Sequence, residues 1–244
     1  MKTKDLAICL RTVNYSETSQ IVTLFAANSG KLSAIAKGSK RPKSSFDGAI
    51  EVLAYGEVVY SSRDSAKLAT LTQFTRDPLF DRIRNDLFSL NCGLFAAELL
   101  NEFTRDFDPH PELFASAVHF LTDVQTADEF NAIALLILFQ LALLDGVGLK
   151  PVLARCANCK NPYSDNWFGT CFSSLANGII CGDCDQSFAD KTRLSKPAAG
   201  ALADIKLLPR ADRKTLNEIE KTLIRHFTEL MHKRPKMAKY ISIR

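Results

Sequence analysis

CANCK at residues 156–160 and CGDCD at residues 181–185 are the two stretches that decide how the second half of this chain is built. Two residues separate the thiols within each pair, and 21 residues lie between the pairs. This spacing is typical of zinc ribbons, in which four thiolates surround a Zn²⁺ ion at about 2.3 Å. It predicts a metal site made of Cys156, Cys159, Cys181 and Cys184.

Four thiolates leave no open coordination position, so the predicted Zn²⁺ is structural and its binding contributes to folding. Turn formers at 161–162 and 177–178 and the strand-like stretch NWFGTCFSS between the pairs favour a ribbon of two hairpins. We expect Gly182 and Asn158 to adopt the unusual backbone angles of the cysteine turns. Cys171 has no partner at this spacing and is expected to be a small buried hydrophobe. A redox pair or a coincidental pair is the alternative, although redox pairs normally follow a strand of a βαβ unit.

Length and composition place the chain among soluble globular proteins. It has 244 residues, which predicts two or three packed units, with 46% hydrophobic and 24% charged residues. The N-terminus MKTKDLAICLRTV lacks an apolar signal region, so a cytoplasmic protein with reduced cysteines is expected. The apolar run 132–144 is shorter than the roughly 20 residues that span a bilayer, which predicts a buried helix and no membrane partner.

Five short β-type runs occupy the first part of the chain. They are DLAICLRTV, QIVTLFAA, KLSAIAKG, EVLAYGEVVYSS and KLATLTQF, separated by polar turn segments. Five such strands are expected to close into a small barrel, which can be an OB-fold or an SH3-like barrel. From residue 77 onward the apolar spacing becomes helical, with one long helix opened by Asp77 and Pro78 and carrying Leu79 to Leu100. Further helices are expected near 111–123, 127–144, 196–207 and 212–231.

These patterns give an α+β multidomain chain. We expect a five-stranded barrel at residues 1–76, the first part of a helical domain at 77–150, a zinc-binding insertion at 151–190 and the rest of the helical domain at 191–244.

Positive charge is concentrated at both ends of the chain. The net charge is +4, yet residues 1–45 carry eight basic and two acidic side chains, and residues 205–244 carry eleven basic and four acidic ones. Anionic partners are therefore expected at the ends. The densest cluster lies in the loop AKGSKRPKS, whose four cations could bind along a phosphate backbone. The candidate DNA-binding residues are Arg11, Lys31, Lys37, Lys40, Arg41 and Lys43 in the barrel and Lys233, Arg234 and Lys236 near the C-terminus.

Each of these features has a plainer interpretation. A basic loop can serve solubility alone, and cations after a helix complement its dipole. Phe25, Phe46 and Tyr55 could stack on bases, but aromatic residues of small barrels are more often core.

In this order of segments the chain resembles the bacterial RecO family of DNA repair and recombination mediators. The resemblance is carried by NYSETSQIVTLFAANSGKLSAIAKGSKRPKS, by CANC and CGDC with NGIIC between, and by LIRHFTELMHKRPKMAKYIS. Asn177 stands where many members have Gly, and the tail reads Arg234-Pro235-Lys236-Met237 where members often have Leu after Pro. The resemblance implies an N-terminal OB-fold that binds DNA, a helical domain and a zinc-binding unit.

The resemblance also implies a function without a chemical step. RecO-like proteins bind single- and double-stranded DNA, anneal complementary strands, act with RecR, contact the acidic, hydrophobic-ended tail of single-strand binding protein (SSB) and help load RecA onto SSB-coated DNA. A cytoplasmic, nucleoid-associated protein is then expected. The alternative is a zinc-ribbon DNA-binding transcription regulator, for which the sequence offers no convincing helix-turn-helix. A hydrolase is disfavoured because the four histidines are scattered and no phosphate-binding glycine loop occurs.

Overall fold

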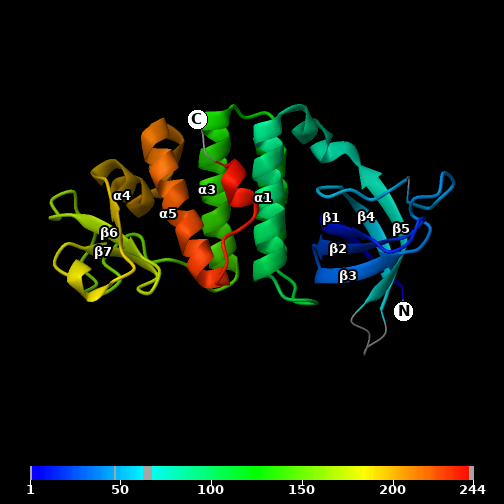
Figure 1. Cartoon of the computed structure of the whole chain (residues 1–244), viewed down its shortest axis with the longest axis horizontal. Helices are drawn as coiled ribbons and strands as arrows, with labels where there is room; N and C mark the ends of the chain where they lie inside the picture. The colour runs from blue at the N-terminus through cyan, green and yellow to red at the C-terminus, as the bar shows by residue number, and fades with distance from the viewer. Residues whose placement is uncertain (1, 47, 63–67, 242–244) are drawn as a thin grey trace. The chain divides into compact units, whose positions relative to one another are not determined.

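The computed structural model describes residues 2–46, 48–62 and 68–241 and divides into two compact units (Figure 1). Unit 1 comprises Met1–Thr126 and unit 2 comprises Ala127–Arg244. Each unit is described by itself.

Unit 1 begins with a closed five-stranded barrel in the order β1-β2-β3-β5-β4. The strands are β1 (Lys2–Asn14), β2 (Gln20–Ala26), β3 (Gly30–Ala36), β4 (Tyr55–Ser61) and β5 (Ala69–Asp77). Neighbours are antiparallel except β3 and β5, which pair in parallel and close the barrel. The expected OB-fold is confirmed, and all five β-type runs form strands.

Alternation of side chains explains how the barrel fills its interior. Val22 and Leu24 on β2 and Leu32 and Ala34 on β3 are fully buried, whereas the residues between them are partly exposed. The fourth strand is shorter than expected, because residues 51–54 form a turn in which Leu53 has a φ of 67°. Leu53 is nevertheless buried, and its N–H donates to the carbonyl of Cys9 at 2.8 Å.

The helical part of unit 1 contains two helices preceded by a 3₁₀ segment. They are η1 (Pro78–Asn85), α1 (Leu87–Phe103) and α2 (Pro111–Val124). The prediction of one long helix through residues 79–100 is wrong, because the chain is extended at Asp86. The Asp86 carboxylate accepts a hydrogen bond from the N–H of Ser89 at 2.7 Å and starts a new helix there.

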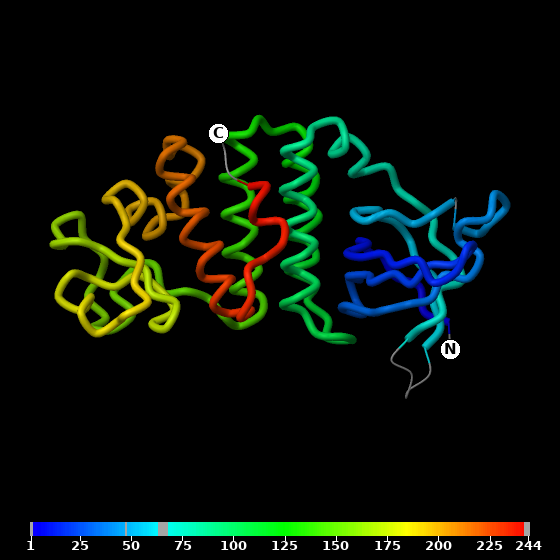
Figure 2. The backbone as a smooth tube through the Cα atoms, in the orientation of Figure 1, coloured from blue at the N-terminus to red at the C-terminus, as the bar shows by residue number. Residues whose placement is uncertain are grey.

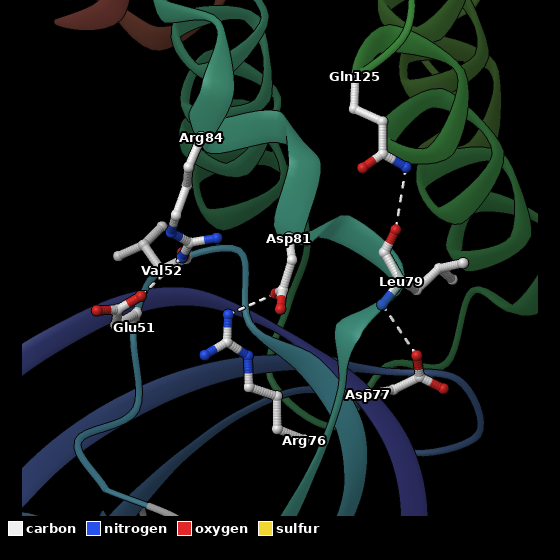
Figure 3. A network of polar contacts seen from close by, with 8 residues as sticks. All are labelled: Glu51, Val52, Arg76, Asp77, Leu79, Asp81, Arg84 and Gln125. Carbon is white, nitrogen blue, oxygen red and sulfur yellow. Dashed lines mark hydrogen bonds and ion pairs between the residues drawn. The ribbon is translucent and has the colours of Figure 1, made fainter.

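Polar contacts fasten η1 to the barrel (Figure 3). Arg84 donates to the carbonyl of Val52 at 3.0 Å and pairs with Glu51 at 3.0 Å. Arg76 on β5 forms an ion pair with Asp81. The Gln125 side chain donates to the carbonyl of Leu79 at 3.0 Å. The barrel and the end of α2 are thereby joined through η1, consistent with one compact unit.

Unit 2 is built around α3 (Glu129–Gly146), which packs against α5 (Arg213–Met231). α3 has 18 residues and a mean hydropathy of 1.6, enough by length and composition alone to cross a membrane. Half of it is buried inside the structure, as expected for the central helix of a protein core. In the chain, α3 and α5 are separated by the inserted segment, α4 (Lys196–Ala203) and η3 (Ile205–Arg210). The predicted helix 196–207 is interrupted at Asp204.

The four cysteines lie in a segment inserted between α3 and α4. It contains β6 (Thr170–Ser173), β7 (Gly178–Cys181), η2 (Asp185–Ser187) and β8 (Thr192–Leu194), with the strands in the order β7-β6-β8. One hairpin is as expected. The other is reduced to a single bridge between Arg155 and Pro162, and β8 adds a strand that the sequence did not indicate. After α5 the chain reverses direction at His232, which has a φ of 54°, and ends in η4 (Met237–Tyr240) (Figure 2).

Candidate metal centre and nucleic-acid interface

The four predicted ligands converge on one point of the inserted segment. The Sγ atoms of Cys156, Cys159, Cys181 and Cys184 all lie within 4.8 Å of one another, and those of Cys159 and Cys181 are 3.7 Å apart. Sulfurs at the corners of a tetrahedron with Zn–S bonds of about 2.3 Å would be roughly 3.8 Å apart. The donor set and its spacing therefore fit a tetrahedral metal ion.

Two tight turns bring the sulfurs together. The N–H of Lys160 donates to the carbonyl of Cys156 at 3.0 Å, and the N–H of Cys184 donates to that of Cys181 at 3.0 Å. The left-handed residue is Lys160, with a φ of 68°, and neither Asn158 nor Gly182 has a positive φ, contrary to expectation. Gly182 is required for another reason: a Cβ there would lie 1.9 Å from the carbonyl oxygen of Phe168.

The thiols differ in how readily they ionise. Burial raises the pKa of Cys156, but backbone N–H groups of Cys181, Cys159 and Asn158 outweigh it and lower the pKa to about 7. Burial and the neighbouring thiols raise the pKa of Cys181 to about 12. Cys156 could thus bind a metal ion as a thiolate near neutral pH, whereas Cys181 would need the positive charge of a bound ion to lose its proton.

Cys171 lies beside the centre without belonging to it. It is buried on β6 and packs with Ile180 in the core of the inserted segment, as expected. Burial raises its pKa, which favours an inert thiol.

The inserted segment is anchored to α5 by contacts that sequence reasoning missed. His226 on α5 is fully buried, its Nδ1 lies 3.0 Å from the hydroxyl of Ser174, and its ring packs edge-on against Phe172 at 5.1 Å. Burial lowers the pKa of His226 to about 4, so it is neutral at physiological pH. The sequence offered no signal for this pair, since 52 residues separate His226 from Ser174.

A pocket in unit 2 also escaped the sequence analysis. Its volume is about 730 Å³. Leu138, Leu141, Leu202 and Ile205 contribute apolar surface, and Lys150, Arg155 and Asp145 contribute charge. The stretch from Leu138 to Arg155 and the distant stretch from Leu202 to Ile205 supply these side chains, which is why no local motif indicated the pocket.

One wall of the pocket is the segment 150–155 that leads into the first metal ligand. The N–H of Val152 donates to the carbonyl of Asn177 at 2.8 Å, and the N–H of Ile179 donates to the carbonyl of Val152 at 2.9 Å. Gly178 is needed here because a Cβ would lie 2.3 Å from the Val152 carbonyl oxygen. The wall is therefore held by β7, whose last residue is the ligand Cys181.

The cationic loop of the barrel, residues 37–43, follows β3. Lys37, Arg41 and Lys43 are exposed and Lys40 is half-buried. Among the residues that the structure describes, no acidic side chain forms an ion pair with any of these four cations. The loop is fixed because the N–H of Lys40 donates to the carbonyl of Thr18 at 3.1 Å. It also rests on the buried Gln20, whose side-chain oxygen accepts from Ser39 at 3.0 Å.

The other predicted DNA-binding residues have different settings. Arg11 is exposed on β1 opposite Thr23. Lys233, Arg234 and Lys236 are exposed in the stretch after α5. Lys31 has a structural position instead: its ammonium donates to the carbonyls of Asn101 and Thr104 at the end of α1.

The side chain of Lys31 is only 13% exposed, and Asp106 lies 3.8 Å from its ammonium. Its charge complements the carboxyl end of the helix. We therefore leave Lys31 out of the proposed DNA-contacting set.

Comparison with known proteins agrees with this arrangement along the chain. Residues 1–76 match the family model for the recombination protein O N terminal, and residues 84–236 match that for the recombination protein O C terminal. The chain belongs to the RecO family. It is thus a member of a DNA repair and recombination family, as the sequence resemblance indicated.

RecO proteins from several bacteria are similar over much of their length. DNA repair protein RecO of Bacillus pumilus is 31% identical over 236 residues, covering 94% of this chain and 89% of the relative. That of Anaeromyxobacter dehalogenans strain 2CP-C is 33% identical over 202 residues, covering 83% and 77%. That of Salinibacter ruber is 38% identical over 149 residues, covering 61% of this chain and 57% of the relative.

Proposed function

We propose that this RecO family chain is a recombination mediator that binds single- and double-stranded DNA, anneals complementary strands, and with RecR helps load RecA onto SSB-coated DNA. The observation that carries the proposal is a hydrogen-bonded loop of four cations on a barrel of the OB type, and none of the four is paired with a carboxylate within residues 2–46, 48–62 and 68–241. OB-folds commonly bind oligonucleotides. Family membership in DNA repair favours this mediator over a transcription regulator.

Annealing follows from electrostatics and needs no catalytic group. Lysine and arginine side chains neutralise phosphates and release condensed counterions, which lowers the repulsion between two strands while their bases stay free to pair. Arg11 and the four loop cations would act in unit 1, and Lys233, Arg234 and Lys236 in unit 2. Such a protein works in the cytoplasm, on the nucleoid, without a chemical step of its own.

The metal in this proposal is a structural Zn²⁺ held by Cys156, Cys159, Cys181 and Cys184. A tetrahedral four-thiolate set favours Zn²⁺ or an iron–sulfur cluster. The closeness of the four sulfurs leaves room for one ion, which supports Zn²⁺.

Replacing Lys37, Lys40, Arg41 and Lys43 by Ala tests the DNA interface. We expect weaker single-stranded DNA binding, and a slope of log affinity against log salt reduced by about 0.7 for each lost phosphate contact. Annealing of SSB-coated complementary strands should slow with it. A variant in which Arg82, Arg105, Lys214 and Lys221 are replaced by Ala is a charge-matched control, since all four are exposed elsewhere. An unchanged slope in the loop variant, or an equal change in the control, would remove this loop from the interface.

We also propose that the pocket of unit 2 holds the SSB tail. An acidic peptide with an apolar C-terminal residue fits a pocket with leucines in its lining and the cations Lys150 and Arg155 beside them. Lys150 is paired with Asp145 at 2.7 Å and would exchange that carboxylate for one of the peptide.

Peptide binding can be measured by fluorescence anisotropy with a labelled acidic, hydrophobic-ended peptide and a scrambled control. Arg155→Ala and Ile205→Asp should each weaken binding of the peptide at least about 10-fold, because one removes a charge contact and the other places a carboxylate in apolar surface. Lys221→Ala, which removes an exposed cation of unit 2 that does not line the pocket, should bind as the wild type does. Full affinity in both pocket variants would exclude this pocket.

A further inference from the structure

The aromatic residues that the sequence offered as base-stacking candidates are not free to stack on DNA. Phe25 and Phe46 are buried at 0% and 5% exposure. Tyr55 is half-buried and packs against Phe80 with ring centroids 5.1 Å apart. Tyr15, in contrast, is 62% exposed. It lies in the turn between β1 and β2, which is one of the loops through which OB-folds bind oligonucleotides.

Hydrogen bonds hold Tyr15 beside the cationic loop 37–43. The N–H of Tyr15 donates to the carbonyl of Ser19 at 3.0 Å, and the hydroxyl of the same Ser19 accepts from the N–H of Gly38 at 3.1 Å. The N–H of Lys40 donates to the carbonyl of the neighbouring Thr18 at 3.1 Å. Ser19 is itself buried. The turn and the loop are thus hydrogen-bonded to each other at one edge of the barrel.

The outer side of β1 continues this edge. Arg11 and Val13 are exposed and alternate with the half-buried Thr12, and Tyr15 follows at the same two-residue spacing just after the strand ends. Val13 lies opposite Ile21 and is 44% exposed. Arg11, Val13 and Tyr15 are therefore all exposed along the end of β1 that leads into the turn, and the turn is hydrogen-bonded to the cationic loop.

This combination distinguishes unpaired bases from paired ones. Arg11 and the cations of the loop can bind the phosphates of either form of DNA. An aromatic ring adds binding free energy only where a base can leave its neighbours and stack on it, which a single strand allows and a closed duplex does not.

We propose that Tyr15 is a base-stacking residue that makes this edge prefer single-stranded over double-stranded DNA. The inference rests on the proposed function, in which the loop 37–43 binds the phosphates. Beyond phosphate binding by the loop, Tyr15 would recognise the face of an unpaired base.

The test compares Tyr15→Ala and Tyr15→Phe with the wild-type full-length protein. Tyr15→Ala should weaken binding of an oligo-dT strand about 5- to 100-fold and change duplex binding less than about 2-fold. The slope of log affinity against log salt should stay unchanged, since no phosphate contact is lost. Tyr15→Phe keeps the ring and should keep the affinity. Phe168→Ala removes an aromatic side chain that is 94% exposed in unit 2, and it should leave binding unaltered.

An abasic strand of the same length isolates the stacking contribution. The wild type should bind the abasic strand more weakly than it binds oligo-dT. Tyr15→Ala should bind the abasic strand with the same affinity as the wild type does. Equal losses for single strand and duplex, no loss with oligo-dT, or an equal effect of Phe168→Ala would each overturn the inference. Failure of the proposed function looks different: the wild type would then bind neither form of DNA at low salt, or binding would ignore the loop cations.

Discussion

Glu220 is a carboxylic acid in the interior of unit 2, on the helix α5 that packs against α3. It is 2% exposed, and its only hydrogen-bond partner in the described part of the chain is the Gln140 amide, which donates to it at 2.8 Å. Burial raises the pKa of Glu220 from 4.5 to about 7. The folded protein therefore keeps a proton that the unfolded chain releases between these two values. Its contribution to stability is complete at low pH and decreases as the pH rises towards 7.

Replacing Glu220 by Gln should make stability less sensitive to pH. The free energy of unfolding can be measured with urea at about pH 5.5 and about pH 8. Between these conditions the wild type should lose up to about 2 kcal/mol relative to the variant, at about 1.4 kcal/mol per pH unit. Glu229→Gln, an exposed change on the same helix, should follow the wild type. Parallel pH profiles for wild type and Glu220→Gln would show that this carboxyl does not titrate in the range.

Substitution of Lys31 can show whether this residue stabilises the fold or contacts DNA. Lys31→Met keeps the apolar stem and removes the ammonium that donates to two carbonyls at the end of α1. We expect the free energy of unfolding to fall by about 1–3 kcal/mol while the salt dependence of DNA binding is retained. Lys37→Met, in the exposed loop, should do the reverse. A reduced salt slope in Lys31→Met would return Lys31 to the DNA interface.

At the scale of elements, we expect the inserted cysteine segment to be stabilised by the ion that we propose for its four cysteines. Its strands are only three or four residues long, and three of the four cysteines of the proposed site are buried in its own small core. Structural zinc sites release on the order of 10–16 kcal/mol on binding.

The double variant Cys156→Ser, Cys181→Ser should therefore lose stoichiometric zinc and the protection of residues 151–195 from hydrogen exchange, while the barrel keeps its protection. Cys171→Ala is the matched control, because this buried cysteine lies in the same core but outside the four-sulfur set. Elemental analysis and exchange mass spectrometry provide the two readouts. Zinc retained by the double variant would overturn the ligand assignment.

The sequence predicted those elements whose signals are local. The five strands follow from alternation, the CxxC pairs from ligand spacing, and the helices from their period. It failed where two local signals compete, as at Asp86, where a capping aspartate interrupts an apolar pattern that continues on both sides. It also missed β8, three residues long, which exists only because β6 is there to pair with it.

The candidate site divides along the same line. Each CxxC pair and the basic loop are local patterns, so the sequence could offer them as candidates, and the structure brings the four cysteines together. The position of Lys31 depends on a contact with Thr104, 73 residues away, and the pocket depends on two distant stretches brought together by packing. The exposure of Tyr15 was equally hidden, because an aromatic residue near a strand end has no local mark of being inside or outside.

At the scale of the whole molecule, two compact units divide the proposed tasks. The barrel and its cationic loop belong to unit 1, whereas the cysteine centre and the pocket belong to unit 2. The wall of the pocket at Val152 is hydrogen-bonded to Asn177 and Ile179 on either side of the start of β7. Loss of the proposed metal should therefore also disturb this wall of the pocket.

Removing zinc with a chelator should weaken binding of the acidic, hydrophobic-ended peptide at least about 10-fold, because the wall loses its support. Binding of single-stranded DNA should fall by less than about 3-fold, since the loop and Tyr15 lie in unit 1. Adding zinc back should restore peptide binding. Equal losses of both activities on chelation would show that the two units do not act separately.

Of the four ligand cysteines, only Cys159 is exposed. Peroxide or an electrophile arriving from solvent would meet this sulfur first, while the other three are shielded. Oxidation there would open the cage at one corner and let the ion escape. Oxidants that damage the chromosome would then also act on a protein that serves its repair, and a single side chain would decide how long the protein lasts in such a cell.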